Sequence, residues 1–416
     1  LGALALAVGL SACAPDVVVE IDVPAQADAQ LADDTLAQLQ TAVTDAMSAT
    51  GSSGAIVGVW VPWGGTWVTG LGTTTPTDDT EVTADMTFRV ADVTRAMTCD
   101  ALYALVADGT VSLDDSITEY VSGVPDLAEV TLRQLCDGTA GIGSYQSTLL
   151  KGWLANPARV WKPRELASYG LGKKRTTEPG EAWRDSDAGY VLLGLALSRA
   201  ADKSASKLLS DEVFAPLELD DTSLPEGDGQ WADGGSLRGT LSRKTSDGTR
   251  NCAEPTDVTD VSTSTGYTDS GVVSTIGDLG RYAQALATGA LAAADDEDAQ
   301  ARWADPKSPS EDAPAWFTTT GGAYQAGTLI GQYGSVPGYL TAAFADPETG
   351  LTVAVVLNNS ASSATQVLDL ALELAAIASK APAAEGETAP QFGLPWTAEQ
   401  YHEAIAEAAV CSDPAS

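Results

Sequence analysis

Histidine is nearly absent from this chain of 416 residues, in which His402 is the only one. His402 lies outside every segment that carries candidate chemistry, so a Ser-His-Asp triad is excluded and we expect an exposed side chain. Cysteine is also scarce, with five residues and no C-x-x-C pair. Since zinc sites are built from clustered cysteine and histidine, we predict no metal and no other cofactor.

Basic residues are few compared with acidic ones. The chain has 22 lysines and arginines against 57 aspartates and glutamates, which gives a net charge of −35 at pH 7. Such an excess argues against binding to nucleic acid and against attraction to anionic lipid headgroups. It favours a solvated acidic surface, and a high-salt habitat would produce the same balance.

Long hydrophobic runs are missing except at the start of the chain. Residues 1–12 are apolar and uncharged, but this run is too short to span a bilayer as a helix. The letters Leu10-Ser11-Ala12-Cys13 resemble a bacterial lipobox, in which the cysteine is acylated. We therefore predict a lipoprotein signal peptide over 1–12, truncated at its front, and a lipid anchor on Cys13 that holds the protein extracytoplasmically at the bacterial cell membrane. A buried hydrophobic helix is the alternative.

Apolar residues make up 44% of the chain, which is enough for a large core. Helical spacing of apolar residues predicts a first helix over 33–48. Two β-rich runs, 55–61 and 66–71, are joined by Pro-Trp-Gly-Gly and predict a hairpin. The last predicted elements are a closing helix, a linker and a short helix, at 367–379, 381–390 and 397–410.

The stretch Phe88–Thr98, which reads FRVADVTRAMT, closes a strand-like run and opens an apolar-periodic helix. Asp92 and Arg95 lie three positions apart, so they share one face of that helix. The spacing predicts an ion pair at the helix start, where an aspartate also suits the positive end of the helix dipole.

This stretch and several others resemble phrases of the serine β-lactamase and penicillin-binding D,D-peptidase superfamily, in the same order along the chain. The resemblance covers about residues 54–359. The phrases include FRVADVTRAMT at 88–98, TLRQLCDGTAGI at 131–142, EPGEAWRDSDAGYVLLG at 178–194 and IGQYGSVPGYLTAAFADPETG at 330–350.

The resemblance implies an α/β (α+β) fold of the β-lactamase/D,D-peptidase type. We expect a five-stranded, mainly antiparallel sheet flanked by helices, with an all-helical lobe and a cleft between sheet and lobe. The predicted parts are a tether with the first helix, the family domain, its helical lobe, and a linker with the C-terminal helix, at 13–50, 51–380, about 92–265, and 381–416.

Five positions that carry chemistry in this superfamily differ here. Aspartate and arginine, Asp92 and Arg95, replace the serine and lysine of S-x-x-K. Carboxylates replace the tyrosine and asparagine of Y-S-N, at Asp185 and Asp187. Gln332 replaces the cation of K-T-G or H-x-G. Arginine remains protonated at any working pH, so Arg95 is a poor general base.

The same resemblance implies further site features. Tyr333 and Gly334 continue the strand beside the cleft, and Gly334 leaves room for close approach of an extended peptide. If Cys13 carries lipid, four cysteines remain, which allow two disulfides and three connectivities. The fold that the resemblance implies favours a disulfide between Cys99 and Cys136, which leaves Cys252 to pair with Cys411.

These observations lead to two main functional hypotheses. The first is a catalytically silent, lipid-anchored homologue that binds a peptidoglycan peptide or another envelope ligand. The alternative is an active hydrolase of the D,D-carboxypeptidase, β-lactamase or esterase type, in which Asp92 activates water opposite Asp185. A third reading is a structural role that does not involve the cleft.

Overall fold

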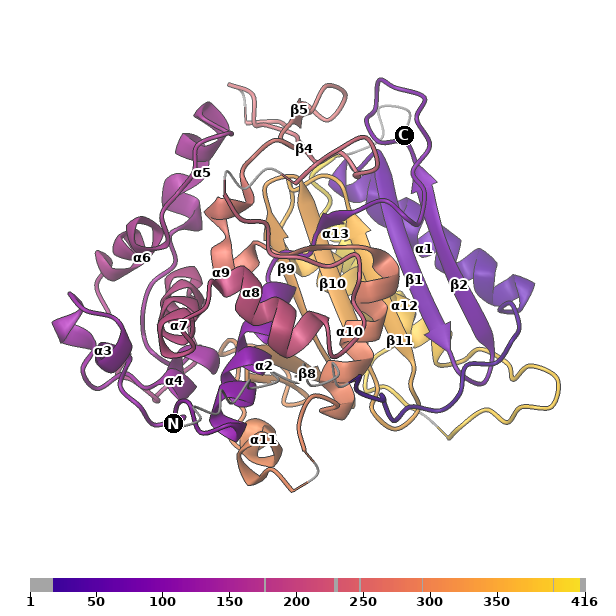
Figure 1. Cartoon of the computed structure of the whole chain (residues 1–416). Coiled ribbons are helices and arrows are strands. Elements are labelled where there is room, and N and C mark those ends of the chain that lie inside the picture. Colours follow the sequence, from indigo (N-terminus) through magenta and orange to yellow (C-terminus); the bar gives the residue numbers. More distant parts are fainter. Residues whose placement is uncertain are drawn as a thin grey trace, which may run out of the picture.

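A seven-stranded antiparallel sheet forms the centre of the protein in a computed structural model, which describes residues 18–411 apart from 176, 228–230, 247, 294 and 392. Across the sheet the strands follow the order β2-β1-β11-β10-β9-β8-β7 (Figure 1). Their bounds are β1 Gly54–Val61, β2 Gly65–Gly72, β7 Phe317–Thr320, β8 Ala323–Ala326, β9 Leu329–Val336, β10 Tyr339–Ala345 and β11 Thr352–Leu357. The short strands β3 Phe88–Arg89 and β6 Val273–Ser274 pair with each other, as do β4 Thr240–Leu241 and β5 Thr256–Asp257.

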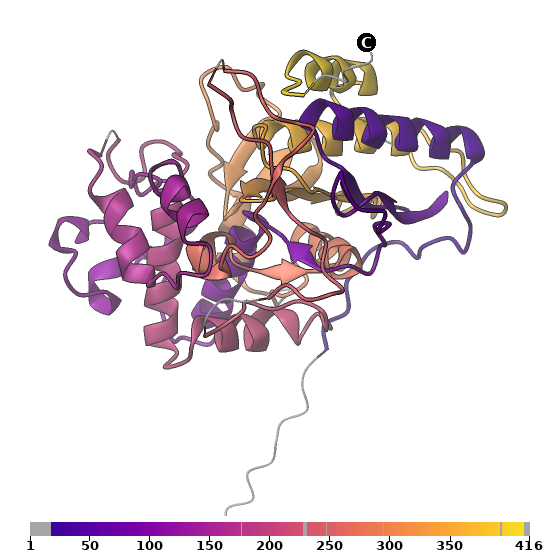
Figure 2. The same ribbon diagram turned by 90° about the horizontal axis from the view of Figure 1, so that it is seen from above.

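Helices cover both faces of the sheet, and this explains why every residue of β10 and β11 is buried. Alternate residues of β1 enter different cores: Val57 and Val59 pack with α1 and α12, whereas Ile56 joins the opposite core. Figure 2 shows α13 outside α1 on the first face. The helices of this face are α1 Asp33–Thr50, α12 Thr365–Ala378 and α13 Ala398–Glu407.

The opposite face carries α2, α10 and a helical lobe, which lies to the left in Figure 1. Thr275 caps the start of α10, because its hydroxyl accepts a hydrogen bond from the Asp278 N–H. The helices on this side are α2 Val93–Ala107, α3 Ile117–Tyr120, α4 Leu132–Cys136, α5 Gln146–Ala155, α6 Pro163–Leu171, α7 Asp187–Ala200, α8 Ala205–Leu209, α9 Tyr267–Ser270, α10 Ile276–Thr288 and α11 Glu297–Gln300.

The predicted fold type is confirmed, but the prediction of five strands was wrong. The two extra strands are the β7–β8 hairpin, which turns through Gly321 and Gly322, both at positive φ. Strand β8 pairs with β9 only as far as Gly331. No phrase that carries the family resemblance covers this hairpin, and its strands are too short to give a clear alternating pattern.

Both predicted disulfides are present. Cys99–Cys136 joins α2 to the end of α4, and Cys252–Cys411 joins the loop after β4 to the chain beyond α13. Cys13 and the rest of the predicted signal peptide lie outside the described residues. Within the part of the chain that the structure describes, no helix is long and apolar enough to cross a membrane.

Strand β9 packs directly on the start of α2. A Cβ atom added at Gly334 would lie 2.4 Å from Cγ of Asp92 and 2.7 Å from its backbone nitrogen. Only glycine fits this contact without a shift of strand or helix.

We predict that Gly334→Ala lowers the free energy of unfolding by about 1–3 kcal/mol, because the added methyl group forces the two elements apart. Denaturant unfolding followed by circular dichroism measures the change. Gly277→Ala is the matched control, because a Cβ on this glycine of α10 meets open space. The control should be neutral or mildly stabilising, and equal losses in both variants would contradict the proposed contact.

Candidate functional site

The chain passes from β3 into α2 through a strained turn. Ala91 has φ 52°, in the left-handed region that residues other than glycine seldom adopt. Asp92 follows at the N-cap position of α2, but its side chain makes no capping hydrogen bond. This side chain is 20% exposed and faces β9 at Gly334. Asp92 therefore lies where the sheet, α2 and the helical lobe meet.

Arg95 lies one turn further along α2, with its side chain only 5% exposed. Its Nε is 2.8 Å from Oδ1 of Asp269, and its Nη1 is 2.8 Å from Oδ1 of Asp185. Its Nη2 is 3.3 Å from Oδ1 of Asp187 and 3.5 Å from Oδ2 of Asp92. One guanidinium thus contacts four carboxylates, and we call these five residues the Arg95 cluster.

Four of the five residues of the Arg95 cluster are positions that the sequence identified as equivalent to catalytic motifs of the superfamily. The predicted ion pair between Asp92 and Arg95 is present, and Asp185 and Asp187 come from the start of α7. Asp269 on α9 was missed, because it lies outside the five positions at which the chain differs from the superfamily motifs.

Asp187 is held by more groups than Arg95 alone. Its Oδ2 accepts hydrogen bonds from the backbone N–H groups of Tyr145 and Gln146, at 2.9 and 2.8 Å. Its Oδ1 accepts the Ser144 hydroxyl at 2.9 Å. These contacts fix the loop before α5 against the start of α7, so Asp187 serves as a structural acceptor within the lobe.

Burial changes the protonation of the Arg95 cluster. It raises the pKa of Asp92 well above its usual 3.8, a rise that Arg95 opposes and the neighbouring carboxylates increase. Burial also raises the pKa of Asp187, and it raises the pKa of Asp269 to about 7 in spite of the ion pair with Arg95. A single guanidinium therefore does not offset the desolvation of these carboxylates.

Gln332 does not join the cluster. Its side chain is buried, its Nε2 donates to the Gly322 carbonyl at 2.8 Å, and its Oε1 accepts from the Tyr333 N–H at 2.8 Å. The amide is therefore used within the β7–β9 edge of the sheet. Tyr333 turns its ring onto Tyr324, with 4.9 Å between ring centroids.

Strand β9 extends beyond its pairing with β8, which ends at Gly331, and a side chain of the helical lobe bonds to this part of the strand. The Gln146 Nε2 donates to the Ser335 carbonyl at 2.8 Å. An extended peptide that paired with this stretch of β9 would have to displace the Gln146 amide from that carbonyl. Sequence reasoning predicted a strand open to a peptide and missed this residue.

The Arg95 cluster has limited chemical options. A guanidinium keeps its proton, so it can orient or bind an anion but cannot remove a proton. A carboxyl group of raised pKa can accept or release a proton near neutral pH. Asp185, with a side chain 57% exposed, and Asp92 are the members that reach solvent.

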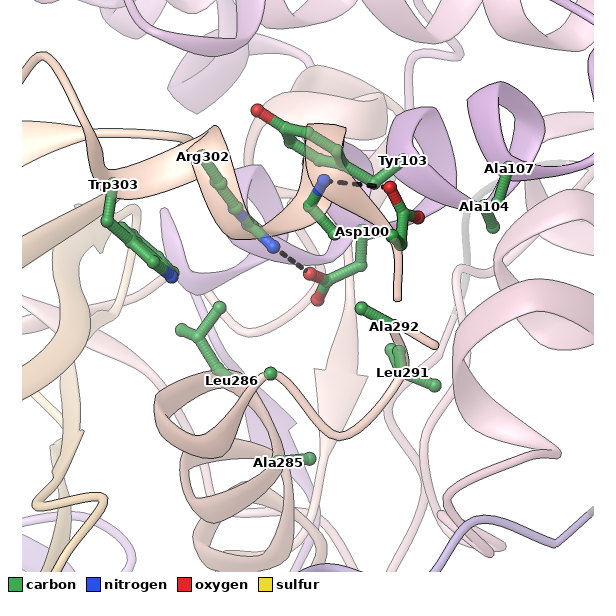
Figure 3. A pocket seen from close by; sticks show the side chains of 13 residues that line it. Asp100, Tyr103, Ala104, Ala107, Ala285, Leu286, Leu291, Ala292, Arg302 and Trp303 are labelled. Carbon is green, nitrogen blue, oxygen red and sulfur yellow. Dashed lines mark hydrogen bonds and ion pairs between the residues drawn. The ribbon is translucent and has the colours of Figure 1, made fainter. Parts of the chain in front are cut away.

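Helix α2 carries a second buried ion pair, shown in Figure 3, between Asp100 and Arg302. The Tyr282 hydroxyl also donates to Asp100 at 2.6 Å, and the Arg302 Nε donates to the Gly321 carbonyl at 3.0 Å. The adjoining cavity of about 50 Å³ has room for a few water molecules. Both charges are already paired, so this cavity offers neither of them to a ligand.

His402 lies on α13, outside the Arg95 cluster. Its side chain is 45% exposed, and its Nδ1 is 3.0 Å from Oε1 of Glu373 on α12. Among residues 18–411 as described above, no three histidine, cysteine or acidic side chains are grouped so that they could hold a metal ion.

We predict that Arg95→Met lowers the free energy of unfolding by about 3–5 kcal/mol at pH 8, because it leaves buried carboxylates without a counter-charge. The loss should be smaller at pH 5. The pKa of Asp269 is about 7 in the folded protein, so the folded state binds more protons than the unfolded state between about pH 4 and pH 7. Its carboxyl group is therefore neutral at pH 5 and charged at pH 8. Denaturant unfolding at both pH values measures the effect.

Arg133→Met is the matched control. Arg133 is one-third exposed and pairs with Asp298 at 3.6 Å on the surface, so its loss should cost less than about 1 kcal/mol at either pH. A cost for Arg95→Met that matches this control, or that does not change with pH, would overturn the electrostatic account.

Comparison with known proteins agrees with the fold. The Beta-lactamase family model matches residues 39–377. The chain is 29% identical over 158 residues to the D-alanyl-D-alanine-carboxypeptidase/endopeptidase AmpH of Escherichia coli (strain K12), and this match covers 36% of the chain and 40% of AmpH. It is 24% identical over 137 residues to penicillin-binding protein 4* of Bacillus subtilis (strain 168), which covers 33% of the chain and 30% of that protein. The chain thus spans less than half of the length of these relatives.

Solved structures show the same fold. A D-stereospecific amidohydrolase from Streptomyces sp. superposes with a TM-score of 0.70 at 24% identity, over 80% of this chain and 98% of that one. The D-amino acid amidase of Ochrobactrum anthropi SV3, complexed with L-phenylalanine amide, gives 0.68 at 23% identity, over 82% and 98%. The family match covers most of the chain, and the fold and the order of the phrases agree with it. The chain belongs to the Beta-lactamase family of β-lactamase-related serine hydrolases.

Proposed function

We propose that this protein is a catalytically silent member of its family that binds a cell-envelope ligand, such as a peptidoglycan peptide. One observation carries the proposal. At the helix start where S-x-x-K chemistry requires a hydroxyl and an amine of depressed pKa, the chain has Asp92 ion-paired with Arg95. A carboxylate gives no stable acyl-enzyme with an amide or an ester, and the guanidinium cannot serve as its base.

The surroundings of Asp92 support the same conclusion. Arg95 is held by four carboxylates, and the amide of Gln332 is bonded to Gly322. Loss of an acylating residue alone removes on the order of 10⁶ of the rate in a serine hydrolase. Here the groups that would assist it are also replaced or engaged in other contacts.

The alternative function is a hydrolase with rearranged machinery. The raised pKa of Asp92, which burial causes, favours it, because a carboxylate with a raised pKa is a stronger base toward water than an ordinary aspartate. Asp185 contacts the same Arg95 guanidinium as Asp92 does. In this alternative Asp92 would be the base.

Hydrolysis assays separate the two functions. We predict that the purified protein hydrolyses a chromogenic ester or a D-alanyl dipeptide no faster than Asp92→Ala, because no acyl or water-activating route depends on this carboxylate. The measurement is the initial rate at pH 6 to 9. A rate that is well above background and disappears in Asp92→Ala would reject the silent form and establish the alternative.

We further propose that lipid on Cys13 holds the protein at the outer side of the cell membrane. The motif Leu10-Ser11-Ala12-Cys13 supports this, and so do two disulfides, which persist in oxidising compartments.

Expression in a bacterial host tests the anchor. We expect the wild-type protein in the membrane fraction, labelled by a fatty-acid analogue, and Cys13→Ala unlabelled, because the acylated thiol is missing. Cys13 is not one of the disulfide cysteines, so the variant should fold normally. Equal labelling of both proteins would contradict the proposal.

A further inference from the structure

Basic residues are concentrated in one short part of this acidic chain. Residues 151–184 contain eight of the 22 lysines and arginines and only three acidic residues, so this segment has a charge of +5 within a chain of −35. The eight are Lys151, Arg159, Lys162, Arg164, Lys173, Lys174, Arg175 and Arg184. The segment includes the second half of α5, all of α6 and the loop after α6, on the outer side of the helical lobe in Figure 1. At physiological salt, charge is screened beyond about 8 Å, so an approaching ligand meets a locally positive surface here.

A cavity of about 430 Å³ lies in this part of the lobe. Lys173 and Arg175 line it together with the apolar side chains of Leu127, Ile142 and Leu171. Asp126 lies at the same cavity, where its backbone carbonyl accepts a 3.4 Å hydrogen bond from the Arg175 Nη2. Within the described residues neither Lys173 nor Arg175 forms an ion pair, so both charges are available to a ligand.

Two glycines, Gly141 and Gly143, pack closely against the segment that carries these cations. A Cβ on Gly141 would lie 2.5 Å from the Thr177 carbonyl oxygen and 3.1 Å from Cγ of Arg175. A Cβ on Gly143 would lie 3.0 Å from Cβ of Lys173. A larger side chain at Gly141 would push Arg175 and Thr177 away, and one at Gly143 would push Lys173 away. These close contacts therefore fix the backbone that carries the two cations.

We propose that this cavity binds an amphiphilic carboxylate, that is, one carboxylate on a short apolar body. The cations provide charge-assisted hydrogen bonds to the carboxylate. Leu127, Ile142 and Leu171 provide an apolar surface of the kind that ligand pockets use. The volume lies within the usual range for small-molecule sites. A long polyanion is disfavoured, because the rest of the protein surface would repel it.

The site is distinct from the Arg95 cluster, although one loop serves both. Gly141 lines the cavity and Gly143 lies against Lys173, and Ser144 to Gln146 bond Asp187 directly afterwards. The inference does not depend on whether the Arg95 cluster is catalytically silent, so the two can fail separately.

Titration calorimetry on the whole protein tests the proposal, with hexanoate as the probe. We expect saturable one-to-one binding of hexanoate that weakens as salt is raised, and at least tenfold weaker binding to Lys173→Ala/Arg175→Ala. Hexylammonium, which has the same apolar chain and the opposite charge, should not bind. Inorganic phosphate should bind at least tenfold more weakly than hexanoate, because it lacks an apolar body.

Lys151→Ala/Lys162→Ala is the matched control, because it removes the same charge from the same segment without touching the cavity lining. It should change hexanoate affinity less than twofold, and thermal melts should show that both double variants remain folded. The proposal is overturned if hexanoate does not saturate, if both double variants lose affinity equally, or if hexylammonium binds as well. Phosphate binding as tight as hexanoate would also reject the amphiphilic ligand, in favour of a simple anion site.

Discussion

The contact of one buried guanidinium with four carboxylates determines how the rest of this site is arranged. Arg95 joins α2 to the start of α7 and to α9, so it connects the helical lobe to the helix that packs on the sheet. Removing one partner from such a buried group destabilises the protein far more than removing one partner of a surface ion pair does. The side chains around Arg95 are therefore committed to charge balance, and this commitment leaves little freedom for proton transfer.

The balance is incomplete, and this affects the charge of the site. Burial raises the pKa values of Asp92, Asp187 and Asp269, and the single guanidinium of Arg95 does not offset it. When these carboxylates are charged, the Arg95 cluster carries excess negative charge. The densest positive charge lies elsewhere, on the outer helical lobe.

Much of the fold could be predicted from the sequence, because scaffold phrases persist around the altered positions. The first helix, the β1–β2 hairpin and both disulfides follow from local patterns or from the family frame. The β7–β8 hairpin could not, since four-residue strands give too little periodicity. The site was predicted only in part: Asp269 and Gln146 act through contacts with residues far away in the sequence, 174 and 189 positions along the chain. The orientation of Gln332 toward Gly322 depends on the missed hairpin.

The central claim is that the site retains the family scaffold without its acyl chemistry. Intact-protein mass spectrometry after incubation with excess penicillin tests it most directly, because an acyl-enzyme adds the full mass of the opened β-lactam to one residue. We predict an unchanged mass after prolonged incubation. A stoichiometric adduct that maps to the segment around Asp92 or to the start of α7 would contradict it.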